Sequence, residues 1–169
     1  MHKYAILTVV SALALSACSR QAPEELPPPP QASTPAPPAA APAPTGPQPG
    51  TQAHFVQSMN GRETIFFDTD RYNIDNQSQT ALQAQAQYLM QHTGVRATIE
   101  GHCDERGTRE YNLALGERRA NAARNYLVSL GVPAERLTTV SYGKERPSAV
   151  GSNAEAWSQN RRAVTVVLN

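Results

Sequence analysis

The sequence predicts an α+β fold in which helices cover one face of a single mixed β-sheet, forming a two-layer sandwich. Three observations lead to this prediction. Short segments of alternating polarity recur along the chain beyond about residue 60, and segments with helical spacing separate them. A capping-box pattern before the last alternating segment adds a third helix, so the predicted order of elements is β-α-β-α-β-α-β.

The first three elements lie before residue 105. The segment ETIFFD (63–68) is rich in aromatic and β-branched residues and predicts a short strand. In 78–92, leucine, alanine and methionine side chains recur at helical spacing, and Gly94 ends the predicted helix. In VRATIEGHCD (95–104), apolar and polar residues alternate, which is typical of a strand that is buried on one face.

The remaining elements complete the predicted sheet and its helical layer. From about residue 110, small and apolar residues recur at steps of three and four, which predicts a helix of about five turns that Gly131 ends. RLTTVSYG (136–143) is a second alternating strand. SNAE (152–155) opens a short helix, and RRAVTVVLN (161–169) is the closing strand.

Residues 1–17 are typical of a bacterial export signal. Lys3 precedes an apolar-rich run of about eleven residues, which is too short to span a bilayer. The run ends in LSAC, which resembles a lipobox, so we expect cleavage before Cys18 and attachment of lipid to that cysteine; ordinary secretion is the alternative. In lipoproteins of this kind an aspartate at the next position favours retention at the inner membrane, so Ser19 predicts export to the outer membrane.

Residues 18–52 form a predicted tether between the lipid and a domain at 53–169. Twelve of the 14 prolines lie between Pro23 and Pro49. Such a segment buries too little apolar surface to offset its ordering entropy, so we expect disorder with polyproline II character. Without the leader, 14 basic and 14 acidic residues remain. Because a balanced chain has no overall field to hold a polyphosphate, nucleic acid is not a predicted partner.

The alternation in 95–104 predicts which polar side chains of this strand face the core. Cys103 shares the parity of the apolar positions, so we expect a buried, unreactive thiol, and with Cys18 lipidated it has no disulfide partner. His102 and Asp104 have the opposite parity. Asp104 lies at the carboxyl end of the strand, where loops often carry function, whereas His102 is interpreted as a hydrogen-bonded structural histidine.

A pair of opposite charges on neighbouring elements is the main candidate for a binding site. Asn112, Leu115 and Arg119 share one face of the following helix, displaced from its core stripe, so Arg119 can turn toward Asp104. A carboxylate and a guanidinium beside one groove suit a zwitterionic ligand, because the first accepts from an ammonium and the second binds a carboxylate. An ion pair of Asp104 with Arg119 or with Arg106 is the alternative.

Four segments resemble the OmpA-like peptidoglycan-binding domain family, and most of all its lipoprotein members. They are FFDTDRYNI, IEGHCDERGTREYNLALGERRANAARNYL, VSYGKERP and NRRAV, and they span about residues 62–168. The resemblance implies an OmpA-like fold without catalytic activity and with no cofactor besides the covalent lipid on Cys18. It also implies that Asp104 and Arg119 bind the diaminopimelate of the peptidoglycan stem peptide.

The resemblance and the helix face together define a larger set of ligand-binding candidates. They are Asp104, Arg119, Asp70, Arg106, Asn112, Leu115 and Phe67. The last five each have a structural alternative. For Asp70 the alternative is a turn or a cap of the first helix, and for Asn112 it is a cap of the second helix. For Arg106 it is an ion pair, and for Leu115 and Phe67 it is ordinary packing.

The resemblance further implies a place in the cell and a set of partners. We expect an outer-membrane lipoprotein that faces the periplasm, holds the membrane to peptidoglycan, and acts in envelope constriction during cell division. The periplasmic β-propeller protein of the Tol system (TolB) is the expected protein partner and competes for an overlapping surface. Arg161 and Arg162, which begin the last strand, are expected to be structural and to pair with loop carboxylates.

Two other functions remain open. A structural lipoprotein would make only protein–protein contacts. A wall enzyme would use Asp68, Asp70, His102 and Asp104 to hold a metal ion. The three histidines outside the leader lack ligand spacing, and the sequence has no G-x-S-x-G motif, so the sequence favours a binding protein over an enzyme.

Overall fold

The computed structural model describes residues 46–168, and the predicted signal peptide, Cys18 and most of the predicted tether lie outside this range. Its four strands form one sheet in the order β1-β4-β2-β3. Strands β2 and β3 are parallel, whereas β4 runs antiparallel to both β1 and β2. The strands are β1 (Thr64–Phe66), β2 (Arg96–His102), β3 (Leu137–Gly143) and β4 (Arg162–Leu168). This mixed sheet confirms the predicted fold class.

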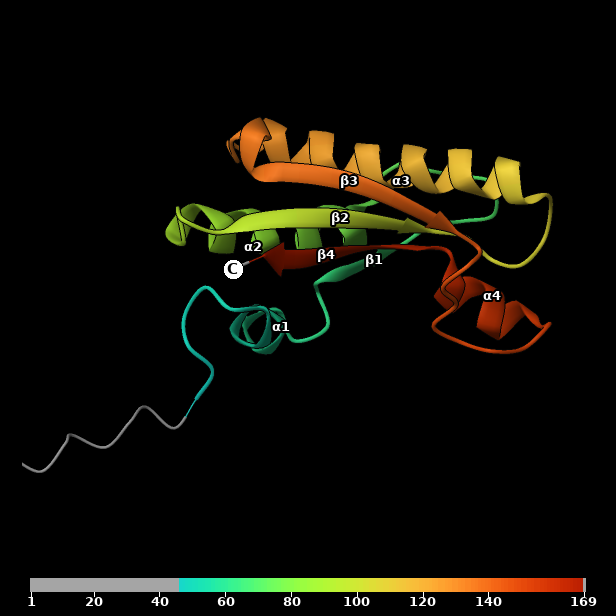
Figure 1. Cartoon of the computed structure of the whole chain (residues 1–169), viewed down its shortest axis with the longest axis horizontal. Helices are drawn as coiled ribbons and strands as arrows, with labels where there is room; N and C mark the ends of the chain where they lie inside the picture. Colours follow the sequence, from blue (N-terminus) through green and yellow to red (C-terminus); the bar gives the residue numbers. More distant parts are fainter. Residues whose placement is uncertain (1–45, 169) are drawn as a thin grey trace, which may run out of the picture. The chain divides into compact units, whose positions relative to one another are not determined.

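The two long helices cover one face of the sheet, and two short helices flank it (Figure 1). Helix α4 lies at the end of the sheet toward which β2 and β3 point, as does the loop from β2 to α3. The helices are α1 (Gln52–Met59), α2 (Asn76–Gln91), α3 (Arg109–Ser129) and α4 (Ala154–Asn160), with a 3-10 turn at Ala134–Arg136. No helix in residues 46–168 has both the length and the apolar character needed to cross a bilayer.

Helix α1 was not predicted, although its sequence carries a signal. Thr51 caps the helix, because its hydroxyl accepts a hydrogen bond from the backbone N–H of His54. Phe55 and Met59, four residues apart, both point into the core. One and a half apolar turns are too short a pattern to distinguish from a loop by periodicity alone.

The core lies between the sheet and helices α2 and α3. Leu82, Leu89, Ile99 and Leu127 are fully buried there. Removing one such side chain from water contributes about 1.5–3 kcal/mol. These contacts fix α3 against β2, which is the arrangement that the candidate site requires.

Strand β2 and helix α3 meet backbone to backbone at a pair of glycines. A Cβ added at Gly101 would overlap the carbonyl oxygen of Gly116, and one added at Gly116 would overlap the Ser141 hydroxyl. Only glycine therefore permits this approach at both positions. Asp104 lies three residues beyond the first glycine and Arg119 three residues beyond the second, so the crossing brings their two elements together.

Candidate functional site

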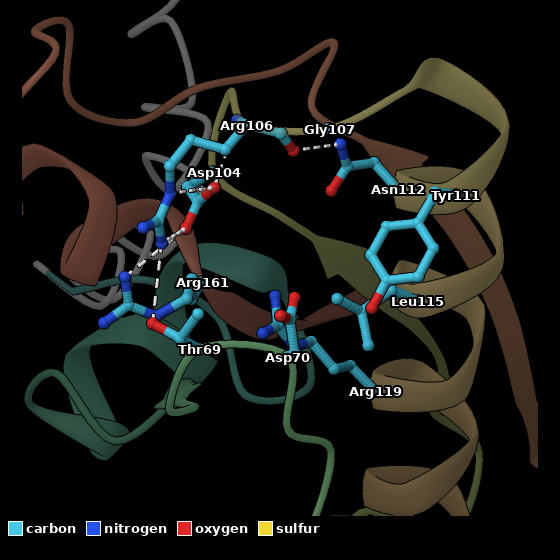
Figure 2. Close-up of a pocket in the computed structure, with 10 residues that line it drawn as sticks. All are labelled: Thr69, Asp70, Asp104, Arg106, Gly107, Tyr111, Asn112, Leu115, Arg119 and Arg161. Atoms are coloured by element: carbon cyan, nitrogen blue, oxygen red, sulfur yellow. Dashed lines mark hydrogen bonds and ion pairs between the residues drawn. The ribbon is translucent and has the colours of Figure 1, made fainter.

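A pocket of about 230 Å³ opens where the β2–α3 loop, the start of α3 and the turn after β1 meet (Figure 2). Six of the seven predicted ligand-binding residues line it. The lining residues are Thr69, Asp70, Asp104, Arg106, Gly107, Tyr111, Asn112, Leu115, Arg119 and Arg161. Residues predicted on separate elements thus surround one common space, and only Phe67 of the predicted set does not line it.

Two arginines hold the carboxylate of Asp104. Its Oδ1 accepts from the backbone N–H and from Nε of Arg106, each at 3.1 Å, and its Oδ2 accepts from Nη2 of Arg106 at 2.6 Å. Nη1 of Arg161 also donates to Oδ2, at 3.4 Å. Burial alone would raise the pKa of Asp104, but the hydrogen bonds and charge of Arg106, with Arg161, lower it. The group is therefore an anion at neutral pH, and the predicted alternative of an Asp104–Arg106 ion pair is present.

Arg119 is fully buried and makes its hydrogen bonds to backbone carbonyls. Nε donates to the oxygen of Arg71 at 2.9 Å, Nη1 to that of His102 at 2.8 Å, and Nη2 to that of Asp68 at 3.1 Å. Burial lowers the pKa of Arg119, but a guanidinium stays charged across the physiological range. Among the described residues, no carboxylate forms an ion pair with Arg119, so the predicted alternative of an Asp104–Arg119 pair is absent.

The charges around the pocket favour an anionic group with a neighbouring cation. Arg106, Arg119 and Arg161 supply three positive charges, and Asp70 and Asp104 supply two negative ones. A buried guanidinium whose hydrogen bonds go mainly to neutral carbonyls gains more from an added anion than an exposed one does, because the local dielectric is low. Together these groups can bind a carboxylate and an ammonium on one ligand.

Asp70 is the pocket carboxylate that remains available. It lies in the turn after β1 with φ 55°, a left-handed conformation that non-glycine residues rarely adopt outside turns. No hydrogen bond from within residues 46–168 engages its side chain. The predicted turn alternative is present and the helix-cap alternative is wrong, because Asp75 caps α2. The turn itself exposes the Asp70 carboxylate at the pocket.

Asn112 and Leu115 both line the pocket, but Asn112 makes hydrogen bonds to the neighbouring loop whereas Leu115 makes apolar contacts. Nδ2 of Asn112 donates to the carbonyl oxygens of Arg106, at 2.7 Å, and Thr108, at 3.0 Å. Because Thr108 is the residue that caps α3, the capping alternative for Asn112 is wrong. Its amide instead ties the loop that carries Asp104 to the helix. Leu115 is buried and gives the pocket an apolar surface.

Cys103 is buried, which confirms the prediction from strand alternation. Its thiol donates to the carbonyl oxygen of Asn112 at 3.3 Å, and Arg119 Nη1 lies 3.5 Å from the sulfur. Burial raises the pKa of this thiol, which keeps it protonated and unreactive at neutral pH.

Phe67 does not line the pocket but contacts two of its arginines, Arg119 and Arg161. Its ring lies 5.2 Å from the guanidinium carbon of Arg119. Its backbone N–H donates to the carbonyl of Arg161, and its own carbonyl accepts from Nε of Arg161, both at 2.9 Å. These contacts hold Arg161 where it can reach Asp104, as predicted for a structural arginine.

Arg162 differs from the prediction. It pairs with no loop carboxylate; its Nη2 donates to the carbonyl of Arg146 at 3.2 Å, and its Nη1 is buried without a partner among the described residues. Arg161 caps the C-terminus of α4, whereas Arg162 is the first residue of β4. The two side chains therefore point in different directions, that of Arg161 toward Asp104 and that of Arg162 toward the carbonyl of Arg146.

His102 is buried without the hydrogen bonds that were predicted for it. Neither ring nitrogen has a hydrogen-bond partner within residues 46–168, and Nε2 lies 3.6 Å from Oε2 of Glu100. The register of β2 and β3 shifts between Gly101 and His102, and the imidazole lies against Tyr142 with ring centroids 5.6 Å apart. Alternation correctly predicted the face of β2 on which His102 lies. On that face, however, the ring of Tyr142 from β3 lies against the imidazole.

The alternative of a metal-binding wall enzyme finds no site in the described part of the chain. No three or more histidine, cysteine, aspartate or glutamate side chains there are placed to share a metal ion. The His102 ring, which that alternative requires, faces away from the pocket and does not line it.

Four residues in or beside the pocket were not predicted from the sequence: the lining residues Thr69, Gly107 and Tyr111, and Trp157 behind Arg106. Trp157 on α4 donates its indole N–H to Oε1 of Glu105 at 3.1 Å, and the guanidinium of Arg106 lies over its ring at 4.3 Å. Nothing in the local pattern of α4 indicates this contact, which depends on tertiary packing. Tyr111, in contrast, lines the pocket four residues before Leu115, so helical spacing could have identified it.

Known proteins share this fold and much of this sequence. The OmpA family model matches residues 66–161. A peptidoglycan-associated lipoprotein of Rhizobium meliloti strain 1021 is 57% identical over 119 residues, which are 70% of this chain and 66% of that protein, so the match spans just under two thirds of its length. The protein of the same name from Mesorhizobium japonicum is 56% identical, and the match covers 70% of each chain.

Solved structures agree with the sequence relatives. The crystal structure of the peptidoglycan-associated lipoprotein from Burkholderia pseudomallei is 44% identical with a TM-score of 0.64, covering 68% of this chain and 99% of that one. The C-terminal domain of Helicobacter pylori MotB is 20% identical with a TM-score of 0.58, covering 63% of this chain and 84% of that one. At this identity the second comparison shows a shared fold alone.

Proposed function

The chain belongs to the OmpA family and, within it, to the peptidoglycan-associated lipoproteins, and from this premise we propose that it binds peptidoglycan non-covalently. The ligand is the diaminopimelate of the stem peptide, whose side chain ends in an ammonium and a carboxylate. The observation that carries the proposal is the pocket in which Asp70, Asp104 and Arg119 meet.

Each charged end of the ligand has a counterpart in the pocket. The carboxylate binds beside Arg119, where it forms the ion pair that no described carboxylate makes with this guanidinium. The ammonium binds between Asp104 and Asp70. Leu115 and Tyr111 pack against the methylene groups that separate the two ends.

Binding leaves the wall intact. The family match supports a non-enzymatic role. Hydrolysis of an amide or glycosidic bond requires a nucleophile or an activated water with a base to remove its proton. Asp104 is engaged by two arginines and Arg119 by three carbonyls, so both serve recognition.

The proposed cellular role is a link between the outer membrane and the wall. Lipid on Cys18 anchors the chain in the outer membrane, the Pro/Ala-rich segment spans part of the periplasm, and the domain faces the wall. The chain acts as part of the Tol-Pal system. In this system TolB competes with peptidoglycan for a surface that overlaps the pocket, and the assembly supports envelope constriction during cell division. The name of the relatives, peptidoglycan-associated lipoprotein, supports the lipid anchor and the wall ligand.

Co-sedimentation with purified peptidoglycan tests the proposed function. We expect the full-length chain to pellet with the wall and Asp70→Asn to bind about ten- to a hundredfold more weakly, because a hydrogen bond to a charged group contributes roughly 1.5–3 kcal/mol. Asp70 is exposed, so this change leaves the core unaltered. Glu145→Gln, which removes an exposed carboxylate outside the pocket, is the matched control.

The other candidate functions give different results in the same assay. A lipoprotein that makes only protein contacts would stay in the supernatant at every wall concentration. A wall enzyme would release soluble muropeptides. Either result would contradict wall binding as proposed.

A further inference from the structure

The carboxylate of Asp104 has no acceptor site left for a ligand. An ionised carboxylate offers about four lone-pair sites. Arg106 fills three of them, with its backbone N–H, Nε and Nη2, and Arg161 approaches the fourth with Nη1. An incoming ammonium can therefore reach Asp104 only by replacing one of these donors.

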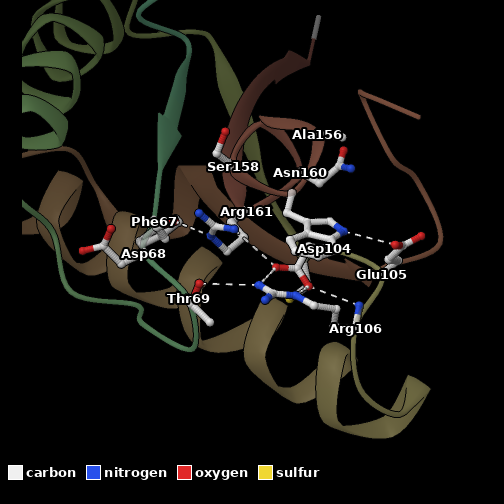
Figure 3. Close-up of polar contacts among 12 residues, drawn as sticks. Phe67, Asp68, Thr69, Asp104, Glu105, Arg106, Ala156, Ser158, Asn160 and Arg161 are labelled. Carbon is white, nitrogen blue, oxygen red and sulfur yellow. Dashed lines mark hydrogen bonds and ion pairs between the residues drawn. The ribbon is translucent and has the colours of Figure 1, made fainter. Parts of the chain in front are cut away.

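Arg106 is the donor that is free to leave. Its side chain is 42% exposed, whereas that of Arg161 is 14% exposed and is tied by Nε to the carbonyl of Phe67. Among the described residues, the Arg106 guanidinium has two contacts besides Asp104. It donates a weak hydrogen bond to Thr69 at 3.5 Å (Figure 3), and it stacks on the ring of Trp157. Its backbone N–H can keep its own bond to Asp104 while the guanidinium moves.

We propose that the Arg106 guanidinium is an internal competitor for the ammonium group of the ligand, and that ligand binding displaces it from Asp104. This inference rests on the proposed function, because it assigns a role to a residue of the same pocket. The resting site holds its own cation, and only a ligand whose carboxylate also binds beside Arg119 gains enough to replace it. Arg106 thereby weakens the binding of every ligand whose ammonium must reach Asp104, and the contact with Arg119 decides which ligands still bind.

The competition lowers the affinity of the resting protein. The apparent dissociation constant is the intrinsic one divided by the fraction of molecules in which the Arg106 guanidinium has left Asp104. A partly exposed ion pair of this kind corresponds to about a two- to fivefold change in binding, so Arg106→Ala should tighten binding by about that factor. The same variant should bind simple amines more tightly by a similar factor, because they too must displace the Arg106 guanidinium.

The single tryptophan of the chain makes the displacement measurable. Trp157 is the only tryptophan, and the Arg106 guanidinium lies 4.3 Å from its ring centre. Departure of a cation from the indole face changes its emission. A diaminopimelate-containing muropeptide should therefore change Trp157 fluorescence in the wild-type chain and produce little change in Arg106→Ala.

The experiment is a titration of the full-length chain with this muropeptide, followed in parallel by calorimetry and by Trp157 emission. Arg109→Ala is the matched control, because it removes an exposed arginine that pairs with Glu145 and does not line the pocket. Tighter binding in Arg106→Ala, with Arg109→Ala near wild type, supports the competitor. Weaker binding in Arg106→Ala alone would overturn it, as would an unchanged Trp157 emission in a wild-type chain that binds. No binding by the wild-type chain would contradict the proposed function itself.

Discussion

Lowering the pH from 7 to 4 is expected to destabilise the folded domain through His102. This imidazole is 2% exposed, and neither ring nitrogen has a hydrogen-bond partner among the described residues. Burial, and then the charges of Arg162 and Arg146, lower the pKa of His102 to about 4. The neutral ring is therefore the form that the folded state accommodates.

The size and direction of the effect follow from proton linkage. The unfolded chain protonates this histidine near pH 6.5, whereas the folded chain does so near pH 4. Between these values the unfolded state binds more protons, so stability falls as the pH falls. A difference of about 2.5 pKa units at 1.36 kcal/mol each corresponds to a loss of roughly 3 kcal/mol by pH 4.

Urea unfolding at pH 7, 5.5 and 4 measures this loss. The variant His102→Phe keeps a planar ring and cannot be protonated, so its stability should fall by about 3 kcal/mol less than that of the wild type over this range. Gln91→Ala, which removes an exposed side chain without an ionisable group at the end of α2, should follow the wild-type curve. If His102→Phe loses as much stability as the wild type, the assignment of acid sensitivity to His102 is incorrect.

Three further changes test the structure around the pocket. Gly101→Ala should destabilise the domain by about 2 kcal/mol or more, because its Cβ would overlap the Gly116 carbonyl; an unchanged melting temperature would contradict the close crossing of β2 and α3. Asn112→Ala should cost about 1–2 kcal/mol in urea unfolding, since it removes two partly buried hydrogen bonds to loop carbonyls, and a loss within error would count against that tie. Arg161→Gln should raise the pKa of Asp104 in an NMR titration, because Arg161 helps to lower it; an unmoved titration would show that the pair contributes nothing.

The sequence predicted the elements of the domain because their signals are local. Alternation identified β2 and β3, and helical spacing identified α2 and α3, each with bounds that differ from the structure by a few residues. The predicted strand at 63–68 is shorter in the structure, Thr64–Phe66, since its pairing with β4 ends at Phe66 and the chain then leads to the turn that contains Asp70. Helix α1 was missed because its apolar face has only two core residues.

The sequence predicts where the site residues lie more accurately than it predicts which groups they form hydrogen bonds with. The end of a strand and one helix face were enough to place Asp104 and Arg119 at one pocket. Their hydrogen bonds depend on the turn after β1 and on α4, which contact them from distant parts of the chain. Arg119 therefore binds carbonyls and Asp104 binds Arg161, and neither contact has a signal in local spacing.

His102 shows the limit of alternation as a guide to burial. The parity of a strand residue tells which face it occupies, but whether that face is covered depends on neighbouring strands and loops. The register shift after Gly101, together with the ring of Tyr142, buries a histidine that parity alone would leave accessible. Local sequence does not show that the His102 ring lacks hydrogen bonds, because this depends on how side chains from separate elements pack around the ring.

Recognition of a paired carboxylate and ammonium by Asp104 and Arg119 can be measured most directly with two matched stem peptides. One contains meso-diaminopimelate, and the other contains lysine, which keeps the ammonium and lacks the neighbouring carboxylate. Calorimetric titration of the full-length chain should give at least about tenfold weaker binding for the lysine peptide, since a charge-assisted contact with Arg119 is lost. Equal affinity for the two peptides would contradict the account.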